Sequence, residues 1–326
     1  MAQIGGGGMA AKRGKLSSSG AGAGAAGEDR LSALPDDVLV LILVRIGLTA
    51  EAARTSVLSR RWRHLWPLLP ELRFDDTPDG HRIGEVLGAP DPPPPLRFIY
   101  VFTEDSSPDS LEAWLPVAAR RLSGDLFYFN ALPFKEKVEE EEEEEEEDQA
   151  GESDAGAVQL PCFESATGIN ISLALLGLAL PPAGTFARLV NLALYCVRLR
   201  GPCELSDVVS SQRCPSLQRL TAGCTCDQPA NWKTEELSLN RLTEVEVTDL
   251  RGAEHEIAFM ERLFSWATML KKMEITFDCS VTKSKARELL QTLASFSRPE
   301  ALVEFYMYDD ADKESTYVLT PEDKEL

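Results

Sequence analysis

The sequence contains few of the residues from which catalytic sites are built. Its 326 residues include only three histidines, His64, His81 and His255, and none has the neighbouring groups that a catalytic dyad or triad requires. The chain has no phosphate-cradling glycine motif, no G-x-S-x-G nucleophile elbow and no H-E-x-x-H motif. We therefore expect a protein that is not an enzyme, with no catalytic residues and no cofactor.

Cysteine is also scarce, and its number is odd. Seven cysteines are scattered through the chain, which favours reduced thiols over a disulfide framework. Cys224 and Cys226 form an isolated C-x-C pair. A structural zinc site needs four ligands at fixed spacing, and no histidine lies near this pair. We expect the two thiols to pack in the protein and to bind no metal.

Long apolar runs and clusters of basic residues are missing. No stretch reaches the roughly eighteen apolar residues of a membrane helix, and the N-terminus lacks the apolar run of a signal peptide. We expect an intracellular protein of the nucleus, the cytoplasm or both, with no membrane partner.

Lys and Arg number 33 against 53 acidic residues, a net charge of −20. Nucleic-acid binding requires clustered Lys and Arg, so no nucleic-acid partner is expected.

Two segments carry most of the acidic charge. Residues 136–154 hold thirteen acidic side chains against one lysine, and residues 309–326 hold seven against two, which leaves a net charge of −3 elsewhere. We expect a disordered acidic insertion at residues 136–157, an acidic tail at 309–326 and a disordered Gly, Ala and Ser-rich tail at 1–28. A basic partner could bind the run Glu139–Glu147; the alternative is a self-repelling loop that binds nothing.

The strongest pattern present lies in residues 29–76. Pro35, followed by two aspartates, predicts the start of a helix, and Gly47 predicts its end. Apolar residues form two faces on this helix. One face comprises Val38, Leu39, Ile42, Leu43 and Ile46, and the other comprises Val40, Leu41 and Val44. A unit of under about fifty residues cannot bury both faces, so the second requires a partner.

The rest of this unit supports a family resemblance. Thr49 is expected to cap a second helix, and a third segment, residues 59–66, ends at Pro67. The strings LPDDVL and TSVLSRRWRHLW, in this order and spacing, resemble an F-box. The resemblance implies a trihelical module that binds the Skp-family adaptor of an SCF (Skp, cullin, F-box) ubiquitin ligase and, through it, a cullin. The positions implied for adaptor contacts and for the unit's own core are Leu34, Pro35, Val38, Leu39, Ile42, Val57, Leu58, Trp62, Leu65 and Trp66.

Beyond this unit the pattern predicts strands and helices in alternation. Residues 80–95 are expected to be an extended connector, residues 96–102 a strand, 110–122 a helix and 125–130 another strand. The repeat L-x-x-L-x-L then begins at Leu173 and Leu189, with degraded copies from Leu217 and Leu239. Leucine-rich strands also occur in ordinary α/β domains, but four copies favour an irregular leucine-rich repeat. Trp114, Trp232 and Trp266 are expected to anchor the core.

Two later segments resemble plant F-box proteins. Residues 181–220 are similar to their leucine-rich repeats, and residues 251–300, which include GAEHEIAFMERLFSWATMLKKMEITF, are similar to their C-terminal FBD region. In the latter, a helix face and a strand at 273–277 are expected to cap the repeat stack. The helix face comprises Ile257, Met260, Leu263, Phe264, Ala267 and Leu270. The group usually carries more repeats before the FBD region, where this chain has only residues 221–249.

The expected fold is therefore mixed α/β, with a domain order taken from these resemblances. A trihelical F-box at 29–76 precedes irregular leucine-rich repeats at 77–250, an α+β FBD-like region at 251–308 and the acidic tail. The resemblance implies the substrate-recognition subunit of an SCF-type ubiquitin ligase, bound to an adaptor and to an unknown protein target. The alternative is a non-catalytic F-box protein that sequesters or scaffolds a partner without ubiquitinating it.

The target surface follows from strand alternation. If the repeat leucines point inward, the residues between them point outward from the same strands. This set includes Tyr195 and Arg219, residue types that are enriched among interface anchors, and Glu244 and Glu246, which favour a basic target segment. We predict that these four residues bind the target; the alternative is an ordinary solvated sheet.

Overall fold

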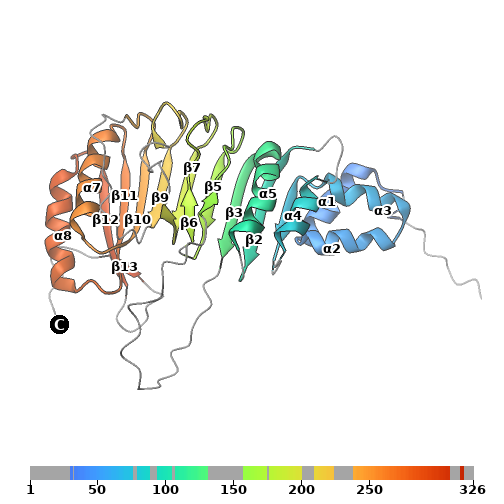
Figure 1. Cartoon of the computed structure of the whole chain (residues 1–326), viewed down its shortest axis with the longest axis horizontal. Coiled ribbons are helices and arrows are strands. Elements are labelled where there is room, and N and C mark those ends of the chain that lie inside the picture. Colours follow the sequence, from blue (N-terminus) through green and yellow to red (C-terminus); the bar gives the residue numbers. More distant parts are fainter. Residues whose placement is uncertain are drawn as a thin grey trace, which may run out of the picture.

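The computed structural model describes residues 30–31, 33–75, 79–88, 94–104, 107–130, 157–174, 176–199, 209–223, 238–308 and 316–318 (Figure 1). The elements follow chain order along the long axis of the molecule, from helices α1 to α3 at one end to helix α8 at the other. Helices combine with a mostly parallel sheet. The predicted mixed α/β class is confirmed at this level.

Helix α1 begins and ends where the sequence signals place it. Helix α1 spans Asp36–Ile46, with Pro35 at the N-cap position. Gly47 ends it at φ 92°, a left-handed conformation that glycine adopts without steric strain. The elements that follow are α2 (Thr49–Arg54), the 3-10 turn η1 (Thr55–Val57), α3 (Arg60–Leu65) and the 3-10 turn η2 (Trp66–Leu68).

The sequence had suggested that Thr49 caps α2, but the structure shows otherwise. The helix begins at Thr49 itself, and the N-cap position belongs to Leu48. The buried Thr49 hydroxyl accepts a hydrogen bond of 2.8 Å from the backbone N–H of Arg73, which lies in strand β1 (Glu71–Phe74). A buried hydroxyl needs a partner, and here the strand supplies it. This bond joins the helices to the sheet.

The expected extended connector at residues 80–95 is wrong in its first half. Gly80–Gly88 form helix α4, in which the buried Ile83 and Leu87 lie four residues apart on one face. Helix α4 packs so closely on α5 (Pro108–Arg121) that a Cβ on Gly80 would lie 2.0 Å from the Ser110 carbonyl oxygen. Glycine has low helix propensity, so this helix depends on packing that the local sequence does not reveal.

A ten-stranded sheet forms the body of the molecule, in the order β1-β2-β3-β5-β7-β9-β10-β11-β12-β13. Neighbouring strands are parallel, except that β12 and β13 are antiparallel. After β1 its strands are β2 (Leu96–Thr103), β3 (Leu122–Asn130), β5 (Gly168–Ser172), β7 (Asn191–Tyr195), β9 (Arg219–Gly223), β10 (Glu244–Leu250), β11 (Lys272–Phe277), β12 (Leu302–Tyr308) and β13 (Thr316–Val318). The strands predicted at 96–102 and 125–130 and the helix predicted at 110–122 are confirmed as β2, β3 and α5.

One face of this sheet is the core. The strand register aligns buried apolar side chains from neighbouring strands, namely Leu72, Ile99, Leu126, Ile169, Leu192, Leu220, Val245 and Met273. Helices α5, α7 (Glu254–Trp266) and α8 (Lys283–Phe296) bury their apolar stripes in the same cluster. Crossovers between neighbouring parallel strands share one handedness, which places α4, α5, α7 and α8 on one side. The opposite side, here named the open face, carries none of these four helices.

Five strands of the sheet are preceded by the same turn. The backbone N–H of a buried leucine donates to the carbonyl oxygen three residues earlier at Leu69, Leu189, Leu217, Leu242 and Leu270. The predicted repeat copies at Leu189 and Leu217 agree with this pattern. The copy predicted at Leu239 is displaced by three residues, because Leu239 occupies the position of Phe186 and Leu242 that of Leu189. Two leucines spaced three apart fit the repeat in either register, so the sequence did not separate them.

The copy predicted at Leu173 does not form a strand of the large sheet. Its Leu178 lies in β6 (Gly177–Ala179), the middle strand of a second sheet between β4 (Val158–Gln159) and β8 (Arg198–Leu199). The large sheet instead receives β5, whose buried hydrophobic side chains are Ile169 and Ile171. Strand β5 contains no leucine, which is why a leucine signature misses it.

The C-terminal elements continue the large sheet. Strand β11 lies between β10 and β12 and confirms the strand predicted at 273–277. In the predicted helix face, Met260, Leu263 and Phe264 are buried on α7, whereas Ile257 is only partly buried. Ala267 and Leu270 follow the end of this helix and are buried in the turn before β11.

Several predictions concern residues that the structure does not describe. They are the tail at 1–28, all but one residue of the insertion at 136–157, Trp232, and the Cys224 and Cys226 pair. Of the other two predicted anchors, Trp114 is buried and Trp266 is partly buried against the core. Within the predicted acidic tail, residues 316–318 form β13, which pairs with β12. Thr, Tyr and Val are residues that favour a strand.

Candidate protein-interaction surfaces

Helix α1 has two apolar faces, but their members differ from those predicted. Leu39 and Leu43 are buried, and Val40 and Val44 pack partly against the same core. Ile42 and Ile46 were expected beside Leu39, yet they are exposed together with Leu41. Residues spaced three or four apart share a helix face, and the predicted stripe was wide enough to span both the buried face and the outer one.

The turn after α2 exposes two further apolar side chains. Val57 and Leu58 have 84% and 61% of their surface accessible. In the described part of the chain nine large hydrophobic side chains are exposed, and seven of them lie between residues 31 and 68. These seven are Leu31, Leu41, Ile42, Ile46, Val57, Leu58 and Leu68. Such a concentration is typical of an interaction surface.

The ten predicted adaptor positions divide by burial. Pro35, Ile42, Val57 and Leu58 are exposed, and Leu34, Val38 and Trp66 are partly buried. Leu39, Trp62 and Leu65 are buried in the core. Sequence reasoning placed Leu41 on the apolar face of α1 that requires a partner, although Leu41 is not among these ten positions. It assigned neither Ile46 nor Leu68 to a surface that contacts a partner.

Arg61 fixes the start of α1. Its guanidinium donates to the Asp36 carboxylate, with a distance of 2.6 Å from Nε to Oδ1, and to the carbonyl oxygen of Leu34. These bonds join helix α3 to the residues just before α1 and to its first turn. The Leu34 and Pro35 segment is therefore held in place by a residue 26 or 27 positions later in the sequence. A planar guanidinium suits this two-point contact better than an ammonium group does.

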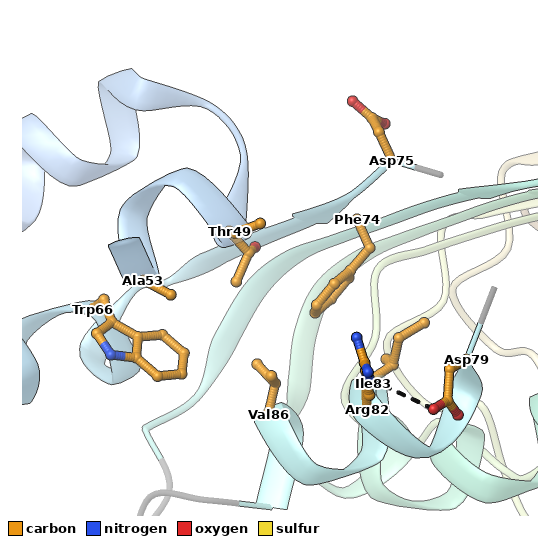
Figure 2. A pocket seen from close by; sticks show the side chains of 10 residues that line it. Thr49, Ala53, Trp66, Phe74, Asp75, Asp79, Arg82, Ile83 and Val86 are labelled. Carbon is orange, nitrogen blue, oxygen red and sulfur yellow. Dashed lines mark ion pairs between the residues drawn. The ribbon is translucent and has the colours of Figure 1, made fainter. Parts of the chain in front are cut away.

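A cavity of about 570 Å³ lies where the N-terminal helices meet the first strand and helix of the body (Figure 2). Trp66 and Ala53 line it from the N-terminal helices, and Ile83 and Val86 from α4. Phe74 of β1 lies between these two sides. The polar lining residues include Asp79 and Arg82, which form an ion pair of 3.7 Å. The lining is thus mostly apolar, and its one basic residue, Arg82, is paired with Asp79.

The open face contains all four predicted target-binding residues. Tyr195, Arg219 and Glu244 lie on β7, β9 and β10, and Glu246 follows on β10. Arg219 and Glu244 are aligned on neighbouring strands and form an ion pair of 3.5 Å between Nε and Oε2. Half of the predicted set is therefore paired internally. The other two predicted residues, Tyr195 and Glu246, take no part in this ion pair.

Tyr195 and Glu246 share one polar environment. The Thr221 hydroxyl donates to the Glu246 carboxylate over 3.1 Å. Burial, and then the charge of Glu246, raise the pKa of the Tyr195 hydroxyl. Sequence reasoning missed two more carboxylates on this face, Glu274 of β11 and Glu304 of β12, which the register aligns with Glu246. The available signal was strand alternation, because each glutamate lies next to inward-pointing residues in its strand.

Two further features of the described residues bear on metal binding and membrane crossing. None of their His, Cys, Asp and Glu side chains gather in a group of three or more that could hold a metal ion. The helices among them are all too short or too polar to cross a membrane.

Comparison with known proteins bears on the N-terminal segment. A putative F-box protein of Arabidopsis thaliana is 54% identical over 48 residues, which are 15% of this chain and 10% of that protein. A putative F-box/FBD/LRR-repeat protein of the same plant is 52% identical over 50 residues, which are 15% of this chain and 11% of that protein. Another F-box/FBD/LRR-repeat protein is 56% identical over 48 residues, which are 15% and 10% of the two chains. These similarities support a plant F-box protein.

The similarity is confined to the N-terminal part of the chain, here named the F-box-like unit and taken as residues 29–76. The chain matches only about a tenth of the length of these relatives. No protein-family model matches the chain. The matched unit coincides with the part of the molecule where exposed apolar side chains concentrate.

Proposed function

We propose that this protein is the non-catalytic substrate-recognition subunit of an SCF-type ubiquitin ligase. Its F-box-like unit binds a Skp-family adaptor and, through it, a cullin, while the open face of the sheet holds a protein target. The ligase accelerates ubiquitin transfer by holding the target near a ubiquitin-loaded enzyme, so this subunit needs two binding surfaces and no nucleophile. It acts inside the cell, in the nucleus or the cytoplasm.

One observation carries this proposal. The segment that is about half identical to plant F-box proteins holds seven of the nine large hydrophobic side chains exposed in the described residues. Burying an exposed Val or Leu contributes about 1.5 to 3 kcal/mol, so a partner that covers several of them gains ample affinity. The buried Leu39, Trp62 and Leu65 hold the unit together, and Pro35, Ile42, Val57 and Leu58 contact the adaptor.

Affinity purification from plant cells tests the proposal. The tagged protein should recover a Skp-family adaptor and a cullin, and proteasome inhibition should enrich one further protein, the target. A chain with Val57→Asp and Leu58→Asp should lose the adaptor and the cullin, because two charges replace buried apolar contacts. The matched control is Met269→Asp with Leu302→Asp, which alters the other two exposed hydrophobic side chains.

The outcomes separate the competing functions. Retention of the adaptor by the Val57 and Leu58 variant would show that the F-box-like unit is not the docking site. Recovery of an adaptor with a partner whose level does not respond to proteasome inhibition would support sequestration instead of ubiquitination. Absence of adaptor and cullin from the wild-type eluate would contradict the proposed function.

A further inference from the structure

The open face carries an aromatic cluster near the F-box-like unit. Phe98, Tyr100 and Phe102 project from β2, and Phe127 and Phe129 from β3. All five rings are partly exposed. Ring centroids lie 5.4 Å apart for Phe98 and Phe127 and 6.3 Å apart for Tyr100 and Phe129. The Phe127 and Phe129 centroids lie 6.4 Å apart and join these two pairs into one continuous surface of four rings, and Phe102 is aligned with Phe129 at its edge.

Strand alternation explains why these rings face outward. The residues between them, Ile99, Val101, Leu126 and Tyr128, are buried, and the Tyr128 ring lies 6.0 Å from that of Trp114 on α5. The core side of β2 and β3 is thus already filled by α5. No helix among α4, α5, α7 and α8 lies over the aromatic cluster, because all four lie on the core side.

The next two strands, β5 and β7, carry smaller side chains on the open face beside the Phe127 ring. The register places Asn170 of β5 beside Phe127 and Ala193 of β7 beside Asn170. Ser172 is the other partly exposed residue on this side of β5, whereas Gly168 is buried beside the Asp125 side chain. Small side chains next to large rings leave room for the backbone of an added segment. Aromatic surfaces of this kind provide much of the energy of protein interfaces.

The far end of the open face is acidic. Glu246, Glu274 and Glu304 are aligned on β10, β11 and β12, and Lys272 bonds to two of them, at 2.7 Å to Glu274 and 3.2 Å to Glu304. Three carboxylates against one ammonium leave this group with a charge of −2. Burial, and then the charges of Glu304 and Glu274, raise the pKa of the neighbouring Tyr306. The ion pair of Arg219 with Glu244 adds no net charge.

The spacing between the two ends sets the length of an occupant. Five strand-to-strand steps separate Phe127 on β3 from Glu274 on β11. Strands lie about 4.8 Å apart, so the separation is roughly 24 Å. An extended chain rises about 3.3 Å per residue and would cover this distance in about seven residues. The negative end excludes a phosphate-bearing ligand and attracts a cationic one.

We propose that the open face binds an extended protein segment that places aromatic or leucine side chains on the aromatic cluster and Lys or Arg, about seven residues away, on Glu246, Glu274 and Glu304. This segment belongs to the target, so the inference rests on the proposed function. Burial against the rings provides most of the binding affinity. The carboxylates fix the position of the segment along the open face and make its affinity depend on salt concentration.

Selection from a phage-displayed library of random peptides of about fourteen residues, against the full-length chain, tests this proposal. The selected peptides should combine aromatic or leucine residues with Lys or Arg about seven positions away. Titration of one selected peptide by fluorescence anisotropy then measures the contribution of each end. Phe127→Ala with Tyr100→Ala should weaken its binding by at least about tenfold at any salt concentration.

The acidic end is tested by Glu274→Gln with Glu304→Gln. This variant should also bind about tenfold more weakly at low salt and should lose most of the salt dependence of the wild type. It leaves the aromatic cluster intact, so it remains informative if the aromatic variant fails to fold. The matched control is Glu254→Gln with Glu261→Gln, the same charge change at exposed positions of α7, which should leave affinity unchanged.

Selected peptides without basic residues, or equal binding by wild type and both open-face variants, would overturn the proposal. Failure to select any peptide would overturn it too. Adaptor pull-down with the same variants separates this result from the proposed function, because neither end of the open face lies in the F-box-like unit. A chain that binds the peptides but no adaptor would keep this inference and refute the ligase assignment.

Discussion

At the scale of single residues, Tyr308 shows how the C-terminal strands are tied together. Its hydroxyl donates to the Asp249 carboxylate over 3.2 Å, which connects β12 to the end of β10 across β11. Asp249 has φ 59°, a left-handed conformation that Asp tolerates better than most residues do. Burial, and then the charge of Asp249 and the hydrogen bond to it, raise the pKa of Tyr308 to about 12.

This raised pKa predicts a loss of stability at alkaline pH. An unfolded tyrosine has a pKa near 10, so between about pH 10 and pH 12 the unfolded chain releases a proton that folded Tyr308 retains. The folded state then binds more protons, and its stability falls as pH rises through this window. Urea unfolding near pH 9, 10 and 11 should show a shallower decline for Tyr308→Phe than for the wild type. Equal slopes would show that Tyr308 does not titrate as described.

Single residues also show which features of the candidate site could be predicted from the sequence. The F-box pattern correctly located the segment in which exposed apolar residues gather, but it could not divide Leu39, Trp62 and Leu65 from Ile42 and Leu58. All are apolar residues at helical spacing, and burial depends on which neighbours a helix meets. Arg219 and Glu244 were likewise placed on the correct face, yet their mutual ion pair depends on strand register, which short repeats specify weakly.

At the scale of elements, helix α4 depends on tertiary contact. Gly80 lies against α5, with its N–H donating over 3.0 Å to the Ser110 hydroxyl. Gly84 is also close to α5, where an added Cβ would lie 3.1 Å from the Ala113 carbonyl oxygen. These glycines let the two helices approach, and the same glycines made the segment look like a connector. The repeat turns were easier to predict, since each carries a leucine at a fixed position before its strand.

A pair of alanine substitutions in α4 tests this packing. Gly80→Ala should destabilise the protein by about 1 to 3 kcal/mol, because the new Cβ would meet the Ser110 backbone and force the helices apart. Gly88→Ala is the control from the same helix, because a Cβ there has no neighbour within 4 Å. It should change stability by less than about 1 kcal/mol. Urea unfolding measures both, and similar losses for the two variants would contradict the close approach of α4 and α5.

At the scale of the whole molecule, the sheet carries the open face and is joined through β1 to the helices that carry the exposed apolar side chains. Strand β1 directly follows the F-box-like helices and pairs with β2, so the F-box-like unit is joined to the body without a flexible connection at this point. Under the proposed function, this junction fixes where a target is held relative to the adaptor. The alternation of strands and helices was predicted from the sequence between residues 96 and 130, where β2, α5 and β3 lie. The second sheet and β13 were not predicted, because their strands are short and carry no repeat signature.

The central claim is that the F-box-like unit binds a Skp-family adaptor through its exposed apolar side chains, and calorimetric titration of the purified chain with a purified plant adaptor tests it most directly. We predict one-to-one binding with a negative heat-capacity change, the mark of apolar burial. Val57→Asp with Leu58→Asp should weaken binding at least roughly 100-fold, and Met269→Asp should leave it unchanged. No binding by the wild type, or equal binding by the Val57 and Leu58 variant, would contradict the account.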